Sequence, residues 1–254
     1  MIIAGIIQAR IGSTRLKGKI LADINGEPML YRVYKQIKNC KLLNKVIIAT
    51  TFLEEDNETV KFLEKNNMEY FRGEPTNVLD RYFECAKKIN ADVIVRMTAD
   101  NPLMDPDIID RVIQHYTEND FDYVANNNPR TYPYGMDVEI FSFNALKEAW
   151  LKSKLPSEKE HVTGYIINNE TFKKDNVSLE EDYSNIRITV DRTKDLELIR
   201  EIYSRIDYRP ILIKHIKKLY KEEPELFRMN ENYIKDEGYF KSLEEDKKFL
   251  AENN

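Results

Sequence analysis

A cluster of cations and small residues follows the first apolar run of the chain. Ile2 to Ile7 is apolar, and the segment Gln8 to Lys19 contains two glycines, two hydroxyl side chains and four cations. The cations are Arg10, Arg15, Lys17 and Lys19. Glycines let backbone N–H groups approach a polyphosphate, which the cations can then neutralise. The pattern predicts a phosphate-binding loop, with a solvated loop of chance basic residues as the alternative. It matches neither the Walker spacing nor GxGxxG, which disfavours a P-loop kinase and a dinucleotide fold.

Two aspartates follow apolar runs at distant points of the sequence. One run ends at Met97, three residues before Asp100, and Ile188 to Val190 leads directly to Asp191. Ligands of open α/β sheets bind beyond the carboxyl ends of strands. Two carboxylates that face the basic loop suit Mg²⁺ bound through few protein oxygens and substrate phosphates. Asp100 and Asp191 are therefore the expected metal ligands, with helix capping as the alternative. Asp195 is either a further ligand or the cap of the helix after it.

Two arginines flank a Gly-Glu-Pro turn before an amphipathic segment. Arg72 and Arg81 could reach the nucleotide base or the acceptor of a transfer reaction. Arginines of this kind also pair with nearby carboxylates at the surface, here Glu74 or Asp80. We assign Arg72 to the nucleotide site and Arg81 to the acceptor site as expectations.

Further acceptor-binding candidates lie in the second half of the chain. Asp137 and Glu139 alternate on an expected strand, so both point the same way. They could bind acceptor hydroxyls or line a solvated strand face. Glu160 and His161 open a charged helical segment, and His161 could bind an acceptor carboxylate or phosphate. A structural histidine is the equally weighted alternative.

Composition limits the class of protein. The chain has 254 residues, of which 42% are hydrophobic and 33% charged, enough for one large α/β domain. The net charge of -5 argues against nonspecific binding of a nucleic-acid polymer, which needs a basic surface. Cys40 and Cys85 match no metal-binding spacing and no disulfide framework, which predicts free thiols in a reducing compartment.

The expected compartment is the cytoplasm, and no membrane partner is expected. The apolar run at the N-terminus is too short for the apolar region of a signal peptide, and no stretch approaches transmembrane length.

The first 120 residues alternate short apolar runs with amphipathic stretches. Strand followed by helix, repeated, predicts a parallel sheet with helices on both faces. Asp105 and Pro106 form an expected cap and first turn. The expected strands are Ile2–Ile7, Lys45–Thr51, Glu69–Phe71 and Asp92–Met97, and the expected helices are Met29–Asn39, Thr59–Asn66, Val78–Ile89 and Asp107–Glu118.

The pattern changes in the second half. We expect one α/β domain over residues 1–210, with a small subdomain for acceptor binding or dimerisation inserted at about 126–184. Within it Val138–Phe141 is an expected strand and Phe143–Ser153 an expected helix. Ile186–Val190 returns to the strand pattern, and Asp195–Ile206 is a strong helix. Residues 211–254 form an expected helical extension, of which 228–254 is a mostly exposed tail.

Several motifs together resemble a known family. The opening stretch IIQARIGSTRLKGKILADINGEPML and the later TADNPLMDP are similar to those of cytidylyltransferases that make CMP-activated acid sugars. Among these, the branch of spore-coat polysaccharide biosynthesis proteins is the most similar. Supporting stretches are VIIATT, FRGEPTNVLDRY, GMDVEIFS, EKEHVTGYI and ITVDRTKDLELI, so that the resemblance covers roughly the first 205 residues.

The resemblance implies a Rossmann-like nucleotidyltransferase fold, a homodimer and an opening loop that holds CTP. Arg10 and Lys19 match the phosphate-binding residues, and Asp100 and Asp191 match metal-binding aspartates. One departure is Lys17, where the family usually has proline. The full set expected to bind the nucleotide is Gln8, Ala9, Arg10, Gly12, Ser13, Arg15, Lys19, Arg72, Thr98 and Ala99.

The expected reaction is in-line attack of an acceptor oxygen on the α-phosphorus of CTP, with release of pyrophosphate. Arg10, Lys19 and Asp100 are the expected catalytic residues, with Mg²⁺ as the cofactor and a small anionic, sugar-like acceptor as the second substrate. Catalysis then rests on positioning and electrostatics without a covalent enzyme intermediate. Two alternatives stay open: a glycosyltransferase that binds an intact sugar nucleotide, and a non-catalytic nucleotide-binding protein.

Overall fold

A seven-stranded sheet forms the centre of the structure, a computed structural model that describes residues 1–253. In order across the sheet its strands are β5 (Tyr70–Gly73), β4 (Lys45–Thr51), β1 (Ile3–Gln8), β6 (Val93–Thr98), β8 (Glu139–Ser142), β7 (Tyr123–Ala125) and β9 (Lys174–Asn176). The first four are parallel, β8 runs antiparallel to β6 and β7, and β9 is parallel to β7. This arrangement confirms the expected α/β fold with a mostly parallel sheet.

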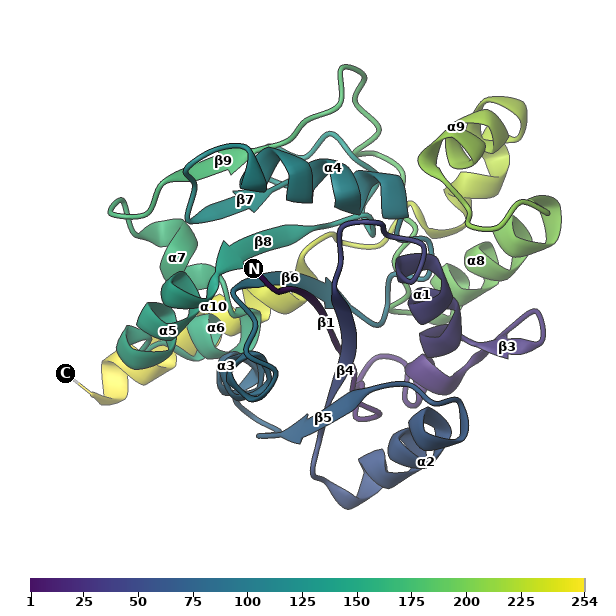
Figure 1. The fold of residues 1–254 in the computed structure, drawn as a ribbon. Coiled ribbons are helices and arrows are strands. Elements are labelled where there is room, and N and C mark those ends of the chain that lie inside the picture. The colour runs from purple at the N-terminus through teal and green to yellow at the C-terminus, as the bar shows by residue number, and fades with distance from the viewer. Residues whose placement is uncertain (254) are drawn as a thin grey trace.

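Helices cover both faces of the sheet because its strands are apolar on both sides, as parallel strands require. Figure 1 shows α1 and α8 on one side and α3 and α5 on the other. Residues of α1 (Met29–Ile37), α2 (Asn57–Lys65), α4 (Pro106–Thr117) and α8 (Thr193–Arg205) share one hydrophobic core. Residues of α3 (Val78–Lys88), α5 (Phe143–Lys152) and α7 (Gly164–Asn168) share the other. Ile6 and Ile7 of β1 point to opposite cores.

The expected elements of the first 120 residues are all present, with each end within two residues of its expected position. The expected cap of α4 is confirmed, because the Asp105 carboxylate accepts hydrogen bonds from the backbone N–H groups of Asp107 and Ile108. Shorter elements between them are η1 (Lys19–Leu21), a hairpin of β2 (Asp23–Ile24) and β3 (Glu27–Pro28), and η2 (Glu54–Asp56).

Residues 126–184 contribute directly to the central sheet. Within this segment β8 lies between β6 and β7, and β9 forms the edge beside β7. The same segment contains α5, α6 (Pro156–His161) and α7. The segment expected to form an inserted subdomain is therefore part of the central sheet.

The expectation of a strand over Ile186–Val190 is wrong. The segment is extended, but only Arg187 forms a bridge, to Tyr134. Its partner is a tight turn, in which Gly135 has φ 114° and a Cβ atom there would lie 2.6 Å from the Thr189 nitrogen. A turn this tight offers no neighbouring strand for a ladder. Single hydrogen bonds fix the segment instead, including one of 2.8 Å from the Val190 N–H to the Asp100 carbonyl.

The C-terminal extension consists of α9 (Ile213–Glu222), η3 (Pro224–Asn230) and α10 (Glu237–Glu252). Most side chains of α10 are exposed, as expected, but the helix packs against α6. Its Asp246 is buried and accepts a hydrogen bond of 2.9 Å from the Ser157 N–H. This contact fixes α10 against α6.

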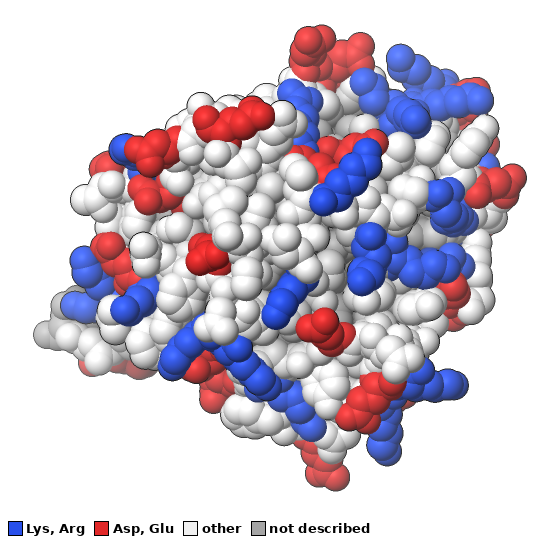
Figure 2. Space-filling model, in the orientation of Figure 1, with Lys and Arg blue, Asp and Glu red and all other residues white. Residues whose placement is uncertain are grey.

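Acidic and basic side chains are interspersed over the face shown in Figure 2. Over residues 1–253, no helix combines the length and the apolar character needed to cross a bilayer.

Candidate active site

A cleft of about 700 Å³ opens beyond the carboxyl ends of β1 and β6. The register pairs Gln8 with Thr98, so the segments after these two strands leave the sheet side by side. Every residue expected at the site except Arg72 lines this cleft: Gln8, Ala9, Arg10, Gly12, Ser13, Arg15, Lys19, Arg81, Thr98, Ala99, Asp100, Asp137, Glu139, Glu160, His161 and Asp191.

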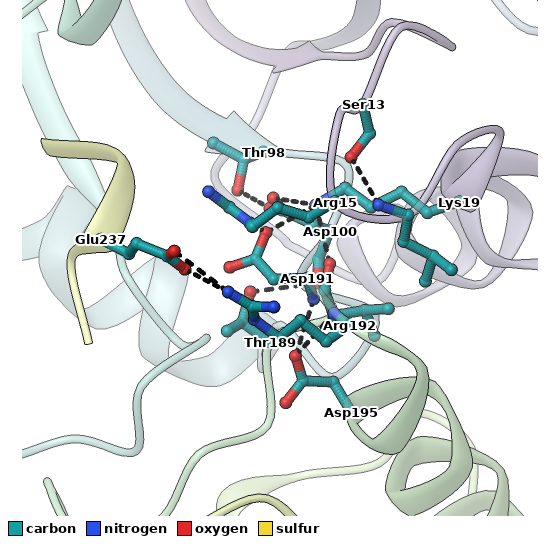
Figure 3. Close-up of polar contacts among 12 residues, drawn as sticks. Ser13, Arg15, Lys19, Thr98, Asp100, Thr189, Asp191, Arg192, Asp195 and Glu237 are labelled. Atoms are coloured by element: carbon teal, nitrogen blue, oxygen red, sulfur yellow. Dashed lines mark hydrogen bonds and ion pairs between the residues drawn. The ribbon is translucent and has the colours of Figure 1, made fainter. Parts of the chain in front are cut away.

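The centre of the cleft is a lysine held between two carboxylates (Figure 3). The Lys19 ammonium donates hydrogen bonds of 2.9 Å to Asp100 Oδ2, 2.9 Å to Asp191 Oδ1 and 2.7 Å to the Val190 carbonyl. Burial alone would lower the pKa of Lys19, but the charges of Asp100 and Asp191 outweigh it and raise the pKa. The ammonium is therefore fully charged at neutral pH.

Asp191 is surrounded by cations. Arg15 Nη2 donates a hydrogen bond of 2.6 Å to its Oδ1, and Arg187 Nη2 donates one of 3.2 Å to its Oδ2. Burial opposes ionisation, but Lys19 and Arg15 outweigh it, so the pKa of Asp191 lies well below its usual range. Asp191 is a permanent anion at the wall of the cleft.

Asp195 is a buried structural group. Its side chain is fully buried and accepts hydrogen bonds of 2.9 Å from the backbone N–H groups of both Asp191 and Arg192. It also forms a two-point ion pair with the guanidinium of Arg187. Of the two roles open from the sequence, the cap at the start of α8 is the one that the structure has.

The loop after β1 is held in shape by its own backbone. Gly18 has φ 68°, a left-handed conformation that favours glycine, and its N–H bonds to the Ile11 carbonyl at 3.2 Å. The Ile11 N–H in turn donates a hydrogen bond of 2.8 Å to the buried carboxylate of Asp56. Lys17 is exposed at the turn and is absent from the residues that line the cleft.

The two carboxylates expected to bind the acceptor are already paired within the chain. Glu139 accepts hydrogen bonds from Arg96, from the Tyr123 hydroxyl at 2.8 Å and from the Thr163 hydroxyl at 2.6 Å. Asp137 forms an ion pair with Arg130. Burial opposes ionisation of Glu139, but Arg96 outweighs it and lowers the pKa. Both carboxylates line the cleft, but Glu139 mainly braces its wall.

The two flanking arginines differ in position. Arg72 lies outside the residues that line the cleft, and its guanidinium donates hydrogen bonds to the backbone carbonyls of Thr51 and Leu53. This placement does not support Arg72 as a nucleotide-binding residue. Arg81 lines the cleft, is only 1% exposed and donates one hydrogen bond of 2.7 Å to the Glu74 carbonyl. Its Nε has no hydrogen-bond partner within residues 1–253.

Arg81 is a buried cation without a carboxylate partner in the described part of the chain, and burial lowers its pKa. A buried guanidinium of this kind gains most from an anionic ligand, because the chain itself leaves part of its hydrogen-bonding capacity unused.

His161 and Glu160 both line the cleft. Arg10 Nη2 approaches Glu160 at 3.4 Å, and both side chains are partly exposed. His161 Nε2 lies 3.0 Å from the Ser242 hydroxyl, and burial lowers its pKa, so the imidazole is neutral at pH 7. The ring is also packed edge-on against Tyr239 of α10.

Helix α10 forms a wall of the cleft that the sequence did not predict. One face of the helix lines it, and Glu237 at its start pairs with Arg192 at 2.9 Å, next to Asp191. The lining residues Gly238, Ser242, Glu245 and Phe249 recur at spacings of four, three and four. This spacing places the four residues on one face of a helix, which the sequence could have indicated. The same spacing is common on exposed helices, so it does not by itself mark a cleft wall.

Comparison with known proteins identifies the family. A model described as cytidylyltransferase matches residues 4–236. The chain belongs to the cytidylyltransferase family. It is therefore a CTP-dependent nucleotidyltransferase, as its motifs predicted.

The relatives of this cytidylyltransferase include one from Methanocaldococcus jannaschii, an uncharacterised protein that is 36% identical over 94% of this chain and 98% of its own length. The spore coat polysaccharide biosynthesis protein SpsF of Bacillus subtilis is 31% identical over 81% of this chain and 88% of its own. A cytidylyltransferase structure from Leptospira borgpetersenii has a TM-score of 0.86 at 32% identity, covering 92% of this chain and 98% of that one.

The chain also resembles enzymes that activate a named sugar acid. The 3-deoxy-manno-octulosonate cytidylyltransferase of Geobacter sulfurreducens is 36% identical over 47% of both chains. At 17% identity, the solved structure of a CMP:2-keto-3-deoxy-manno-octonic acid synthetase with CTP shares the fold, with a TM-score of 0.64.

The family model ends at residue 236, one residue before α10, so this cleft-lining helix lies beyond the matched residues. The metal site would rest on Asp100 and Asp191 alone, because no three His, Cys, Asp or Glu side chains within residues 1–253 form a metal-binding group. Two carboxylates fit magnesium in the common arrangement in which substrate phosphates and waters complete its coordination.

Proposed function

We propose that this cytidylyltransferase transfers CMP from CTP to a small anionic, sugar-like acceptor and releases pyrophosphate. The observation that carries the proposal is the cationic loop after β1 facing Asp100 and Asp191 across one cleft. A triphosphate needs cations along its length, and Arg10 and Arg15 line the cleft beside Lys19. Ser13 adds a hydroxyl donor in the same cleft.

In the proposed reaction an acceptor oxygen forms a bond to the α-phosphorus of CTP, and the bond from that phosphorus to the bridging oxygen breaks. The electron pair of the broken bond leaves with pyrophosphate, and the proton of a hydroxyl acceptor passes to water. Magnesium, held by Asp100 and Asp191, would supply positive charge at the reacting phosphate. Arg10 and Lys19 bind the phosphates, and they stabilise the charge that develops on the leaving group.

The acceptor end is proposed to bind an anionic group and hydroxyls. Arg81 offers a buried and incompletely bonded guanidinium, and His161 and Ser242 offer neutral polar groups in the same cleft. These features, together with the relatives that act on 3-deoxy-manno-octulosonate, support an acid sugar or a related phosphate as the acceptor. Assembly as a homodimer stays a prediction from the resemblance.

The test is pyrophosphate release from CTP and Mg²⁺ with a panel of acid sugars and sugar phosphates. We expect turnover with CTP in preference to ATP, GTP and UTP. Asp100→Asn is expected to reduce turnover by at least about 100-fold, because it removes a carboxylate that would hold the metal at the reacting phosphate. Asp207→Asn, at an exposed aspartate two residues past the end of α8, is the matched control.

Three outcomes would contradict the proposal. Near-normal turnover of Asp100→Asn would remove Asp100 from the reaction. Binding of a sugar nucleotide without pyrophosphate release would favour a glycosyltransferase. CTP binding that is independent of metal and never leads to turnover would favour a non-catalytic protein.

A further inference from the structure

The Lys19 ammonium uses its full hydrogen-bonding capacity inside the chain. An ammonium has three N–H donors, and those of Lys19 meet Asp100 Oδ2, Asp191 Oδ1 and the Val190 carbonyl at 2.7–2.9 Å. The side chain is only 10% exposed. Lys19 therefore cannot contact a phosphate without giving up at least one of these three partners.

The two carboxylates are also engaged within the chain. Asp100 accepts from the Thr98 hydroxyl at 2.5 Å on Oδ1 and from Lys19 on Oδ2. Asp191 accepts from both Arg15 and Lys19 on Oδ1 and from Arg187 on Oδ2. Each of the four carboxylate oxygens thus accepts at least one hydrogen bond from the chain. The oxygens that converge on one point, Asp100 Oδ2 and Asp191 Oδ1, converge on the Lys19 ammonium.

The local charge also opposes a divalent cation. Three cations, Lys19, Arg15 and Arg187, contact the two carboxylates. Asp195 is the main partner of Arg187, so Lys19 and Arg15 already balance the charges of Asp100 and Asp191. A divalent ion added while both cations stay in place adds uncompensated positive charge next to them, and like charges repel strongly where water is partly excluded. A bound triphosphate reverses the balance, because it is a polyanion that can draw the lysine and Arg15 toward itself.

We propose that Lys19 and a divalent cation are alternative occupants of one site between Asp100 and Asp191, so that metal and nucleotide bind as a pair. The proposal rests on the proposed function, in which Lys19 binds CTP phosphates. In the free enzyme the ammonium fills the site and keeps the carboxylates in place. When CTP binds, Lys19 moves to the phosphates and the released carboxylate oxygens accept the metal. The metal alone therefore binds weakly.

The experiment measures metal binding without nucleotide, with Mn²⁺ alone as the probe and its free concentration followed by electron paramagnetic resonance. The full chain is compared with Lys19→Met, which keeps a side chain of similar length but removes the charge. We expect Lys19→Met to bind one Mn²⁺ at least tenfold more tightly than the wild type. Lys19→Gln provides a second neutral side chain if Lys19→Met does not fold, which thermal melting shows.

Two controls make the result specific. Lys19→Arg keeps a cation and is expected to bind Mn²⁺ as weakly as the wild type. Adding Asp100→Asn to Lys19→Met is expected to abolish the new tight site.

Tight Mn²⁺ binding by the wild type, equal to that of Lys19→Met, would overturn the proposal. So would a neutral Lys19 variant that gains no site dependent on Asp100. Neither result depends on an acceptor or on turnover. The Mn²⁺ measurement can therefore support this inference when the pyrophosphate assay fails, and it can contradict the inference when the pyrophosphate assay succeeds.

Discussion

Asp195 organises a buried polar network beneath the cleft, and its replacement by alanine has a calculable cost. Its carboxylate accepts from Arg187 Nε at 2.9 Å and Nη2 at 3.0 Å, and from Asn230 Nδ2 at 2.7 Å. It also accepts from the backbone N–H groups of Asp191 and Arg192 at 2.9 Å. In Asp195→Ala the Arg187 guanidinium stays buried and keeps only its 3.2 Å contact with Asp191 among carboxylates.

The expected loss of stability in Asp195→Ala comes from leaving the buried Arg187 guanidinium without its main partner. Removing one member of a buried ion pair costs about 3–5 kcal/mol. For a chain of this size each kcal/mol corresponds to a shift of about 2–4 °C in Tm, so we expect a fall of roughly 6–20 °C. Asp195→Asn, which keeps an acceptor oxygen, is expected to lose less.

The assay combines thermal melting with urea unfolding of wild type, Asp195→Ala, Arg187→Met and the double variant. Because the two side chains share one network, their effects are expected to be non-additive by more than about 1 kcal/mol. Asp207→Asn at an exposed position is expected to change stability by less than about 0.5 kcal/mol.

One combination of results would contradict a structural role for Asp195. If Asp195→Ala melts within 2 °C of the wild type while its metal-dependent turnover collapses, then Asp195 acts on the metal and is no structural brace. Additive effects of Asp195→Ala and Arg187→Met would separately contradict the ion pair as the source of the stability.

Three further outcomes are expected. Burial lowers the pKa of His161 from its ordinary value of 6.5, so the unfolded chain binds a proton there more readily than the folded chain. Wild-type stability is therefore expected to fall as the pH drops from 6.5 toward the lower pKa of the folded state. His161→Gln is expected to flatten that fall, by at most about 1.4 kcal/mol per pH unit, in urea unfolding between pH 5 and 7; equal slopes would contradict it. Gly135→Ala is expected to lose at least about 2 kcal/mol in the same assay, because the new Cβ would lie 2.6 Å from the Thr189 nitrogen at a φ of 114°. Lys17→Pro is expected to leave the Tm unchanged or slightly raised, since the Lys17 N–H is not used in a hydrogen bond within residues 1–253; a loss above about 1 kcal/mol would show that the loop cannot hold proline.

Local sequence patterns predicted the elements of the first 120 residues well. Continuous apolar periods and turn residues mark the β1 strand, its basic loop and the helices after it. The structure has these elements close to their predicted positions. The convergence of Asp100 with Lys19 could also be predicted, because both follow strands that were expected to end at one edge of the sheet.

Long-range partners could not be predicted in the same way. Arg187 supports Asp191 from an extended segment that only a tight turn at Gly135 accommodates, and no local pattern marks that pairing. Arg72 has a pattern like that of Arg81, but their environments differ because one guanidinium binds loop carbonyls and the other is enclosed at the cleft. The sequence of helix α10 is typical of a solvated helix, because most of its residues are polar and its cleft-lining residues form no continuous apolar stripe.

In the proposed reaction, the enzyme cleaves CTP at its α-phosphorus and passes CMP to an acceptor. Phosphorus-31 NMR of a single reaction containing CTP, Mg²⁺ and an acid-sugar mixture follows every phosphate at once. We expect equal growth of a pyrophosphate signal and a new CMP ester signal as CTP disappears. Growth of CDP and inorganic phosphate in their place, or CTP that persists although it binds, would contradict it.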